Sequence, residues 1–374
     1  EKGDYDIRIG TDVRHTVSAG VHKEKKLRVC EQLTEVSAVA YENRFMRLRP
    51  LYSDGKVSVT FEPSPVRTVD LKEEILDSLP PYIARTDRSI TLDDVLNGRA
   101  TPEDLAGTLS NDELEAITRG AYIMNSPLGA KGNASVFCGV LPSLREKGIP
   151  PITCTDGPSG IRLSQSSALL PNGTALASTW NGELVSSLYE LLGKEMLARG
   201  SDVLLAPGMN IHRNPLCGRN FEYFSEDPLV SGKSAAAVVR GLQRTGVSAC
   251  PKHFCCNNQE TRRTKNDSVL CERALREIYL KGFEICVKEA RPKTIMTSYN
   301  KINGVWGHYN YELVTAILRG EWGFDGAVMT DWWMQSSVSP EFPKLKDQAY
   351  RVRAGVDVLM PGGARVGKKT PDGT

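Results

Sequence analysis

Residues 326–333, Gly-Ala-Val-Met-Thr-Asp-Trp-Trp (GAVMTDWW), are a short apolar run followed at once by a carboxylate and two indoles. Five more apolar runs lie at 149–154, 202–207, 246–251, 293–298 and 355–360. Longer segments with apolar residues at helical spacing separate several of these runs, for example 182–200 and 271–290. This alternation predicts a βαβα series, which requires a parallel sheet.

Two architectures share this pattern, an open doubly wound sheet and a closed (β/α)8 barrel. The residues that follow the runs are polar, charged or glycine: Thr155-Asp156-Gly157, Gly208-Met209-Asn210, Lys252-His253, Tyr299-Asn300, Asp331-Trp332 and Pro361-Gly362-Gly363. A barrel assembles its site from many such loops, whereas a doubly wound sheet uses one switch point and usually carries GxGxxG after its first strand. We therefore predict an α/β fold with a (β/α)8 TIM-like barrel. The two strands missing from the six are expected near 118–140 and beyond residue 363.

The first 65 residues have a different pattern. Residues 4–9 alternate as a strand with one buried face does, and Val57, Val59 and Phe61 repeat the alternation. The polar, proline-rich stretch 63–81 predicts a linker or strap. Helix starts are expected at Thr91, at Thr101-Pro102 and at Ser110 with Glu113. The predicted divisions are β structure over 1–65, linker and capping helices over 66–108, a barrel over 109–363 and a tail over 364–374.

Composition excludes several classes of protein. The 47 Lys and Arg residues balance 45 Asp and Glu residues, so the net charge is +2 and nucleic-acid binding by bulk charge is excluded. No apolar stretch approaches the roughly 20 residues of a membrane helix, and the first residues lack a signal peptide's pattern. Nine cysteines, mostly inside apolar runs, favour a reducing, cytoplasmic location. We expect no cofactor and no metal, because no HExxH or CxxC spacing occurs and the adjacent Cys255 and Cys256 are unsuited to chelating one zinc ion.

The strand ends supply candidate site residues. Asp331 could attack or stabilise a developing cation, although a helix N-cap explains it equally well. Lys252 and His253 suggest an anionic or richly hydroxylated ligand, whereas a lone histidine is more often a core residue. Six further candidates belong to the same predicted rim: Asp156, Arg162, Arg219, Arg263, Tyr299 and Trp332. Turn formation alone explains Asp156 tolerably well, but the mixture of charges and aromatic rings on one rim favours polyol recognition.

Six motifs carry a family resemblance: TDGPSGIR (155–162), GRNFEYFSEDP (218–228), PKHFCCNNQETRR (251–263), TSYNKING (297–304), VMTDWW (328–333) and AGVDVLMPGG (354–363). In this order they make residues 151–363 resemble the barrel domain of glycoside hydrolase family 3, in its β-glucosidase branch. The resemblance implies a retaining, exo-acting β-glycosidase, most simply a β-glucosidase, with Asp331 as nucleophile. It also implies that Asp156, Arg162, Arg219, Lys252, His253, Arg263, Tyr299 and Trp332 bind the terminal sugar.

The resemblance also concerns the acid/base residue and the domain order. In the family this residue is a glutamate on a separate α/β sandwich domain, and no convincing second carboxylate occurs in this chain. DYDIRIGTDVR (4–14) resembles the closing strand of a fibronectin-type-III-like domain that normally follows the sandwich domain, yet here it precedes the barrel. We therefore expect a permuted order, with residues 1–65 ending the fibronectin-like domain. A companion polypeptide or missing segment would then carry the sandwich domain.

The sugar and the reaction class are partly open. The residues after KHF are CCNNQE, where the N-acetylglucosaminidase branch has PGHG, which favours a sugar with a plain 2-hydroxyl over an N-acetyl sugar. A β-xylosidase is the runner-up, and arabinose stays open. Two other classes compete: a Schiff-base aldolase that uses Lys252, and a non-catalytic sugar-binding barrel, motivated by the missing acid. A homo-oligomer is compatible with the sequence.

Overall fold

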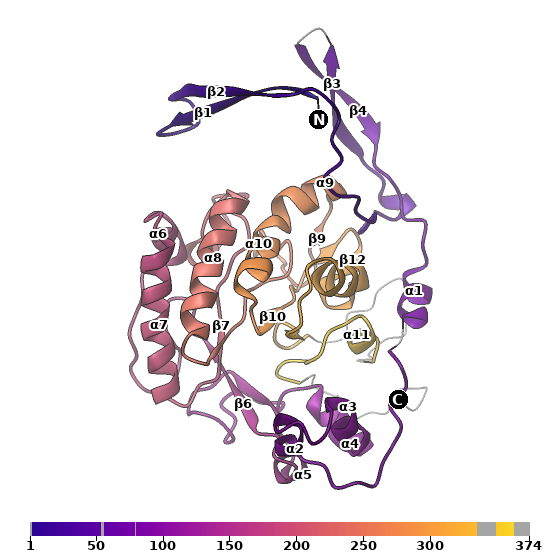
Figure 1. Cartoon of the computed structure of the whole chain (residues 1–374), viewed down its shortest axis with the longest axis vertical. Helices are drawn as coiled ribbons and strands as arrows, with labels where there is room; N and C mark the ends of the chain where they lie inside the picture. The colour runs from indigo at the N-terminus through magenta and orange to yellow at the C-terminus, as the bar shows by residue number, and fades with distance from the viewer. Residues whose placement is uncertain (1, 54–55, 79, 335–348, 363–374) are drawn as a thin grey trace. The chain divides into compact units, whose positions relative to one another are not determined.

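The computed structural model describes residues 2–53, 56–78, 80–334 and 349–362 (Figure 1). The chain divides into two units, Glu1–Val36 and Ser37–Thr374. The first unit contains an antiparallel hairpin of β1 (Gly3–Gly10) and β2 (Thr16–Glu24). The predicted strand over 4–9 is therefore confirmed. Its predicted buried face is wrong for the described residues, because a two-stranded ribbon has no layer of its own to cover that face, and Ile9 is 65% exposed.

A second hairpin, in the second unit, consists of β3 (Met46–Ser53) and β4 (Lys56–Pro63). Its register places apolar residues opposite each other, for example Leu48 opposite Phe61 and Tyr52 opposite Val57. Since side chains alternate between faces along a strand, one face of the ribbon is apolar throughout. This face also remains exposed in the described structure, with Phe61 at 62%.

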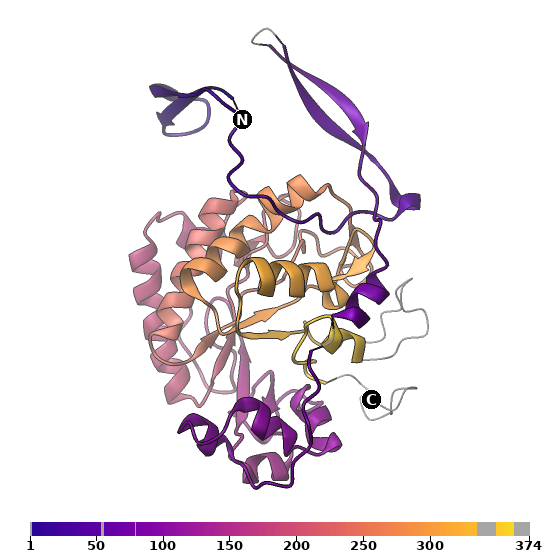
Figure 2. The ribbon, with the colours of Figure 1, turned by 45° about the vertical axis from the view of Figure 1, so that its right-hand side comes forward.

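The rest of the second unit is mixed α and β, with helices around short strands (Figures 1 and 2). The central strands are β5 (Ser135–Cys138), β6 (Pro151–Asp156), β7 (Val203–Leu205), β8 (Ser248–Ala249), β10 (Thr294–Met296) and β13 (Ala327–Met329). The α-helices are α1 (Leu71–Asp77), α2 (Leu92–Leu96), α3 (Pro102–Gly107), α4 (Asn111–Ile117), α5 (Pro142–Glu146), α6 (Gly173–Ala177), α7 (Gly182–Ala198), α8 (Pro228–Gln243), α9 (Glu272–Ala274), α10 (Lys281–Ala290) and α11 (Ala349–Arg353). Two π-helical segments, η3 (Leu275–Tyr279) and η5 (Glu312–Glu321), complete the longer helical elements. A small sheet contains β9 (Asp267–Ser268), β11 (Lys301–Ile302) and β12 (Val305–Trp306).

Backbone pairing within the described residues passes through the central strands and returns to its starting point. The sheet β5-β6-β7-β8 continues to the pair β10-β13 through the bridge between Phe254 and Thr297. Bridges from Met329 to Val358, from Leu359 to Arg119 and from Gly120 to Phe137 then lead back to β5. The segments around 119 and 358 thus complete a closed ring, the form in which a sheet has no free edge.

The ring differs from the prediction at one strand. β5 pairs antiparallel with β6, whereas β6, β7 and β8 pair in parallel. The reversal has a local cause: residues 121–134 form a loop without a helix, so the chain turns back beside the segment 118–120 and does not cross over to run parallel to it. Both strands absent from the sequence count lie between 118 and 138. The other predicted location, beyond residue 363, is outside the described residues.

The helices are placed by ordinary local rules. The predicted helix starts at Thr91, Thr101 and Ser110 are confirmed, because each of these side chains accepts a backbone N–H of the first turn in a capping box. Helix α8 packs between α7 and α10, and the three lie side by side (Figure 1). Residues of the ring strands and of the segments beside them form one buried apolar cluster: Ala134, Phe137, Cys154, Val203, Leu205, Cys250, Met296, Met329, Trp332, Val358 and Met360. No helix among the described residues is long and apolar enough to cross a membrane.

Candidate active site

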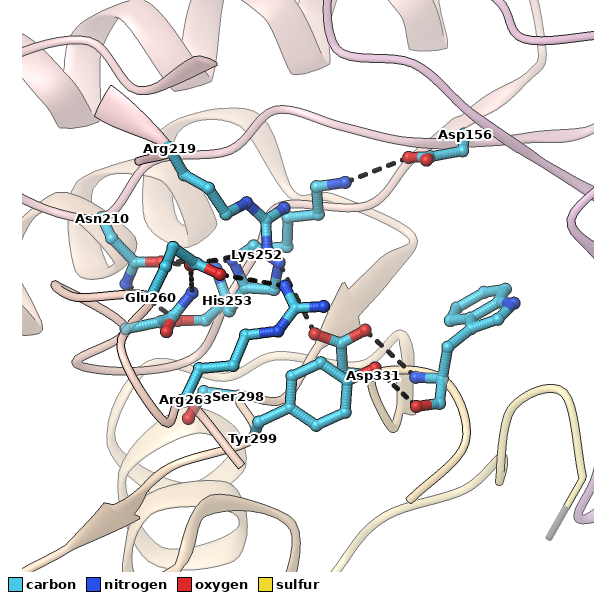
Figure 3. A network of polar contacts seen from close by, with 12 residues as sticks. Asp156, Asn210, Arg219, Lys252, His253, Glu260, Arg263, Ser298, Tyr299 and Asp331 are labelled. Atoms are coloured by element: carbon cyan, nitrogen blue, oxygen red, sulfur yellow. Dashed lines mark hydrogen bonds and ion pairs between the residues drawn. The ribbon is translucent and has the colours of Figure 1, made fainter. Parts of the chain in front are cut away.

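The predicted rim residues lie at the carboxyl ends of the ring strands. Asp156 is the last residue of β6, Lys252 and His253 follow β8, Tyr299 follows β10 and Asp331 follows β13. Because β6, β7 and β8 are parallel, and β10 is parallel to β13, these ends are brought to one face. Figure 3 shows the side chains converging there.

Asp331 is a buried carboxylate with one free oxygen. Asp331 is 8% exposed, and its Oδ1 accepts the backbone N–H of Trp332 at 3.0 Å. Oδ2 has no hydrogen-bond partner within the described structure. Burial raises the pKa of Asp331 to about 6, although the nearby charges of Arg219, Lys252 and Arg263 act in the opposite direction. The carboxylate is therefore ionised at neutral pH and its free oxygen is able to react or accept.

Lys252 and Asp156 form an ion pair across the site. Lys252 Nζ lies 3.3 Å from Asp156 Oδ1, and Arg162 donates to Asp156 Oδ2 at 2.9 Å. Burial alone would raise the pKa of Asp156, but the charges of Lys252 and Arg162 lower it overall. The Arg162 side chain is 74% exposed, so it lies at the outer edge of the group. Asp156 is thus a fixed acceptor with donors on two sides.

Two arginines are held by acidic partners that the sequence analysis did not place in the site. Arg219 pairs with the buried Glu222, three residues further along the chain. Arg263 donates to Glu260 at 3.1 Å, and Glu260 also lies 4.0 Å from Arg219. Both guanidinium groups are therefore oriented before any ligand arrives.

Tyr299 and Trp332 form the aromatic part of the site. The Arg263 guanidinium carbon lies 4.9 Å from the centre of the Tyr299 ring. The Tyr299 hydroxyl donates to the backbone carbonyl of Trp332 at 2.5 Å. Burial, followed by the charge of Asp331, raises the pKa of Tyr299. The Trp332 indole donates to the Ala134 carbonyl at 2.9 Å, which fixes its ring in the wall.

His253 lies between the carboxylate and a second set of buried polar groups. Its Nε2 is 3.6 Å from Asp331 Oδ2. Its Nδ1 is 3.3 Å from both Asn210 Oδ1 and the Tyr223 hydroxyl. Burial and then the charges of Arg219, Lys252 and Arg263 hold the pKa of His253 well below its usual range, so the ring is neutral. Asn210 and Tyr223 were not predicted as site residues, although both lie in loops that follow β7.

The nine predicted residues thus lie in one connected network, and Asn210, Tyr223, Glu222 and Glu260 join it. The network combines fixed acceptors, fixed donors and aromatic surfaces around one carboxylate that has a free oxygen. Among the described residues, no group of three or more His, Cys, Asp or Glu side chains could hold a metal ion. Such a set of groups suits recognition of a polyhydroxylated, uncharged ring with a nucleophilic attack at one carbon.

Known proteins resemble this chain closely. Residues 101–368 match the model of the glycosyl hydrolase family 3 N-terminal domain. A β-glucosidase of Ruminococcus albus is 44% identical over 363 residues, which are 96% of this chain and 38% of that protein. An exo-α-(1→6)-L-arabinopyranosidase of Bifidobacterium longum is 43% identical over 234 residues, which are 59% of this chain and 30% of that protein. A solved β-glucosidase structure from Paenibacillus barengoltzii is 47% identical with a TM-score of 0.88 and covers 96% of this chain and 40% of that one.

The chain therefore spans about two fifths or less of the length of these relatives. The family model covers well over half of the chain, and it includes every one of the predicted site residues. The chain belongs to glycosyl hydrolase family 3.

Proposed function

We propose that this chain is the nucleophile-bearing part of a retaining, exo-acting β-glycosidase that removes terminal non-reducing β-D-glucosyl residues. The observation that carries the proposal is the free oxygen of Asp331, ionised at neutral pH and surrounded by Arg219, Lys252 and Arg263. In a retaining mechanism such a carboxylate attacks the anomeric carbon and forms a glycosyl-enzyme intermediate, which water then hydrolyses. The β-glucosidases among the relatives support this reaction class.

The sugar would be held by the other predicted residues. Asp156 offers two carboxylate oxygens to hydroxyl groups, while Lys252, Arg219 and Arg263 offer charged donors. Tyr299 and Trp332 would provide apolar surface for a ring face. Glucose is our first choice; xylose is the alternative, and the arabinopyranosidase relative keeps arabinose under consideration. Relative kcat/KM values for p-nitrophenyl β-glucoside, β-xyloside and α-L-arabinopyranoside would rank the three.

The acid/base residue is proposed to come from an α/β sandwich domain outside this chain, on a companion polypeptide or another segment of the same protein. The other carboxylates of the described network, Asp156, Glu222 and Glu260, each pair with a lysine or arginine. The charges of Lys252 and Arg162 lower the pKa of Asp156, which opposes its use as a proton donor. The carboxylates of Glu222 and Glu260 are already engaged by Arg219 and Arg263. We further propose that the ring is a (β/α)8-type barrel with β5 reversed.

Residues 1–65 are proposed to end a fibronectin-type-III-like domain, followed by a linker with capping helices over 66–108, the barrel over 109–363 and a tail over 364–374. Two antiparallel hairpins, each with an apolar face, support the β domain. A single two-stranded hairpin is marginally stable in water, so such faces are expected to be buried by further strands.

Labelling tests the nucleophile directly. The full-length polypeptide would be incubated with 2,4-dinitrophenyl 2-deoxy-2-fluoro-β-D-glucoside, whose intermediate hydrolyses slowly, and then digested for mass spectrometry. We expect one added fluoroglucosyl group on the peptide that contains Asp331, and none in Asp331→Asn. That variant should lose turnover but still bind glucose. A label on another residue, or normal turnover in Asp331→Asn, would remove Asp331 from the mechanism.

Two rival functions give different results. A Schiff-base aldolase needs a Lys252 amine that is free to attack a carbonyl group, whereas Lys252 Nζ donates to Asp156 Oδ1 at 3.3 Å. Borohydride trapping of a carbonyl substrate on Lys252 would favour the aldolase. A non-catalytic sugar-binding barrel would bind glucose without label or turnover in the full-length protein.

A further inference from the structure

The proton on His253 can be located from the groups that surround the ring. A neutral imidazole carries its proton on either Nδ1 or Nε2, and the other nitrogen is then an acceptor. Tautomers are assigned from hydrogen-bond networks, since hydrogens are not seen directly. His253 is 1% exposed, so its neighbours within the protein decide.

Asn210 is the neighbour whose orientation is fixed. Its Nδ2 donates to the His253 backbone carbonyl at 2.9 Å, and its Oδ1 accepts the His253 backbone N–H at 3.0 Å. A carbonyl only accepts and an N–H only donates, so the amide cannot be turned over without losing both bonds. The backbone supports this placement: Gly208 bridges to Lys252, and the Met209 N–H bonds to the Lys252 carbonyl at 2.8 Å, which extends the β7–β8 pairing beyond the strands. Figure 3 shows Asn210 beside His253.

The same Asn210 Oδ1 lies 3.3 Å from His253 Nδ1. Because this oxygen is an acceptor, contact with it is favourable only when Nδ1 carries the proton. The other group at this nitrogen, the Tyr223 hydroxyl, also lies at 3.3 Å. Its oxygen already accepts the Asn257 Nδ2–H at 3.2 Å, and it can still accept a second hydrogen bond from Nδ1 or donate its own proton to Nδ1. We propose that Asn210 is a positioning residue that holds the proton of His253 on Nδ1, so that Nε2 is presented beside Asp331 as a hydrogen-bond acceptor.

This assignment has a consequence for the ligand, which rests on the proposed function. Nε2 and the ionised Oδ2 of Asp331, 3.6 Å apart, are then both acceptors and cannot bond to each other. In contrast, Arg219, Lys252 and Arg263 only donate. The site therefore requires one sugar hydroxyl to donate its proton to His253, while hydroxyls facing the cations accept.

The tautomer is tested without any activity. The full-length protein, labelled with 15N-histidine, would be sedimented and studied by solid-state NMR, with His253 identified by its loss in His253→Gln. We expect Nδ1 protonated and Nε2 unprotonated. In Asn210→Leu the Tyr223 hydroxyl becomes free to donate to Nδ1, so the proton should move to Nε2, where it can bond to Asp331. Asn258→Leu is the matched control, because it removes a buried side-chain amide that donates to the Ile211 carbonyl at 2.6 Å. Its His253 spectrum should match that of the unaltered protein.

A protonated Nε2 in the unaltered protein would overturn the proposal, and so would an Nδ1 proton that persists in Asn210→Leu. These results do not depend on whether the protein hydrolyses glycosides, so they separate failure of the tautomer assignment from failure of the proposed function.

The inhibition constants of monodeoxy and monofluoro glucoses test the prediction that one sugar hydroxyl donates to His253 Nε2. Fluorine accepts weakly and cannot donate. At the hydroxyl that faces Nε2, the fluoro and deoxy sugars should therefore lose equal affinity, roughly tenfold, whereas at hydroxyls that face the cations the fluoro sugar should bind better than the deoxy sugar. If fluorine restored affinity at every position, Nε2 would have to be a donor and the proposal would fail.

Discussion

Burying the Asp331 carboxylate lowers the stability of the folded protein at neutral pH. Burial raises its pKa from 3.8 to about 6, so the folded state binds this proton more tightly than the unfolded state does. The contribution of Asp331 to stability therefore falls as pH rises from about 4 to about 6, and the deficit persists above that range. A site that must hold an ionised, partly unbonded carboxylate has to tolerate this deficit.

We expect Asp331→Asn to stabilise the full-length protein. The deficit at pH 7 corresponds to about 3 kcal/mol, and because the buried amide keeps some desolvation cost of its own, a gain of about 1 to 3 kcal/mol is expected. The gain should shrink as the pH falls toward 4, where the folded-state carboxyl is protonated and the unfolded-state carboxyl, with its ordinary pKa of 3.8, is about half protonated. Thermal unfolding midpoints between pH 4 and pH 8 would measure it. A gain that does not change with pH would contradict the assigned cause.

The pH profile of the reaction should depend on Arg219. Among the cations near Asp331, Arg219 contributes most to lowering its pKa. The acid limb of kcat/KM, which reports free-enzyme groups, is expected near pH 6 in the unaltered protein. Arg219→Gln should move that limb to higher pH by roughly 1 unit, whatever it does to the maximum rate.

Arg162→Gln provides the control for this shift. Arg162 bonds Asp156 at 2.9 Å, and it is not one of the groups with the largest effects on the pKa of Asp331. Its acid limb should therefore stay in place. Equal shifts in both variants would show that the limb does not belong to Asp331.

At the residue scale, strand ends were predictable and supporting contacts were not. Asp156, Lys252 and Asp331 could be identified because each follows an apolar run, and the structure brings them together. Asn210 and Glu260 act through other side chains, and such pairings depend on which loops become neighbours. The one available signal was the concentration of polar residues after β7 and β8. The roles of these residues stay predictions until labelled or mutated.

At the scale of elements, helix starts follow from local chemistry. The Ser110 hydroxyl accepts the Glu113 N–H at 3.2 Å, and the Glu113 carboxylate accepts the Ser110 N–H at 2.8 Å. The same carboxylate forms an ion pair with Lys147 Nζ at 2.6 Å. All of these partners but Lys147 lie within four residues, which is why the sequence predicted the start of α4. The direction of β5 was not predictable in this way, because it depends on a loop where the barrel pattern expects a helix.

Ser110→Ala should cost about 1 kcal/mol of stability, the usual value of an N-cap. The loss arises because the Glu113 N–H loses its acceptor. Hydrogen exchange of the 111–117 amides, followed by mass spectrometry, would locate the effect. Ser110→Thr keeps a hydroxyl at this position and should behave like the original. Fraying in both variants would point to the side-chain volume and away from the cap.

At the scale of the whole molecule, the alternating pattern predicted one strand of each hairpin, β1 and β4, but neither its partner strand nor the layer that covers its apolar face. An alternation of apolar and polar residues along a strand identifies the apolar face, but it does not identify the layer that packs against that face. On β3–β4 the apolar residues include Val57, Val59 and Phe61, while Ser58 lies on the opposite face. This difference allows the proposed β domain to be tested.

Phe61→Lys should destabilise the full-length protein by about 1 to 3 kcal/mol, because it would place a charge against a buried apolar layer. Ser58→Lys, on the polar face, should change stability by less than about 0.5 kcal/mol. Limited proteolysis within residues 46–63 would report the loss of the domain locally. If both variants resisted proteolysis equally, the apolar face would have to be exposed in the full-length protein.

The closure of the ring has a consequence for how such proteins are assembled from gene segments. The Gly120 N–H bonds to the Leu359 carbonyl at 2.9 Å, and the Leu359 N–H bonds to the Thr118 carbonyl at 2.9 Å. The first and last segments of the ring, around residues 118–120 and 359, are therefore hydrogen-bonded neighbours. A recombination event that moved flanking sequence from one side of this seam to the other would leave Asp331 and its neighbours undisturbed. This architecture therefore tolerates a reordering of the flanking segments around an unchanged ring.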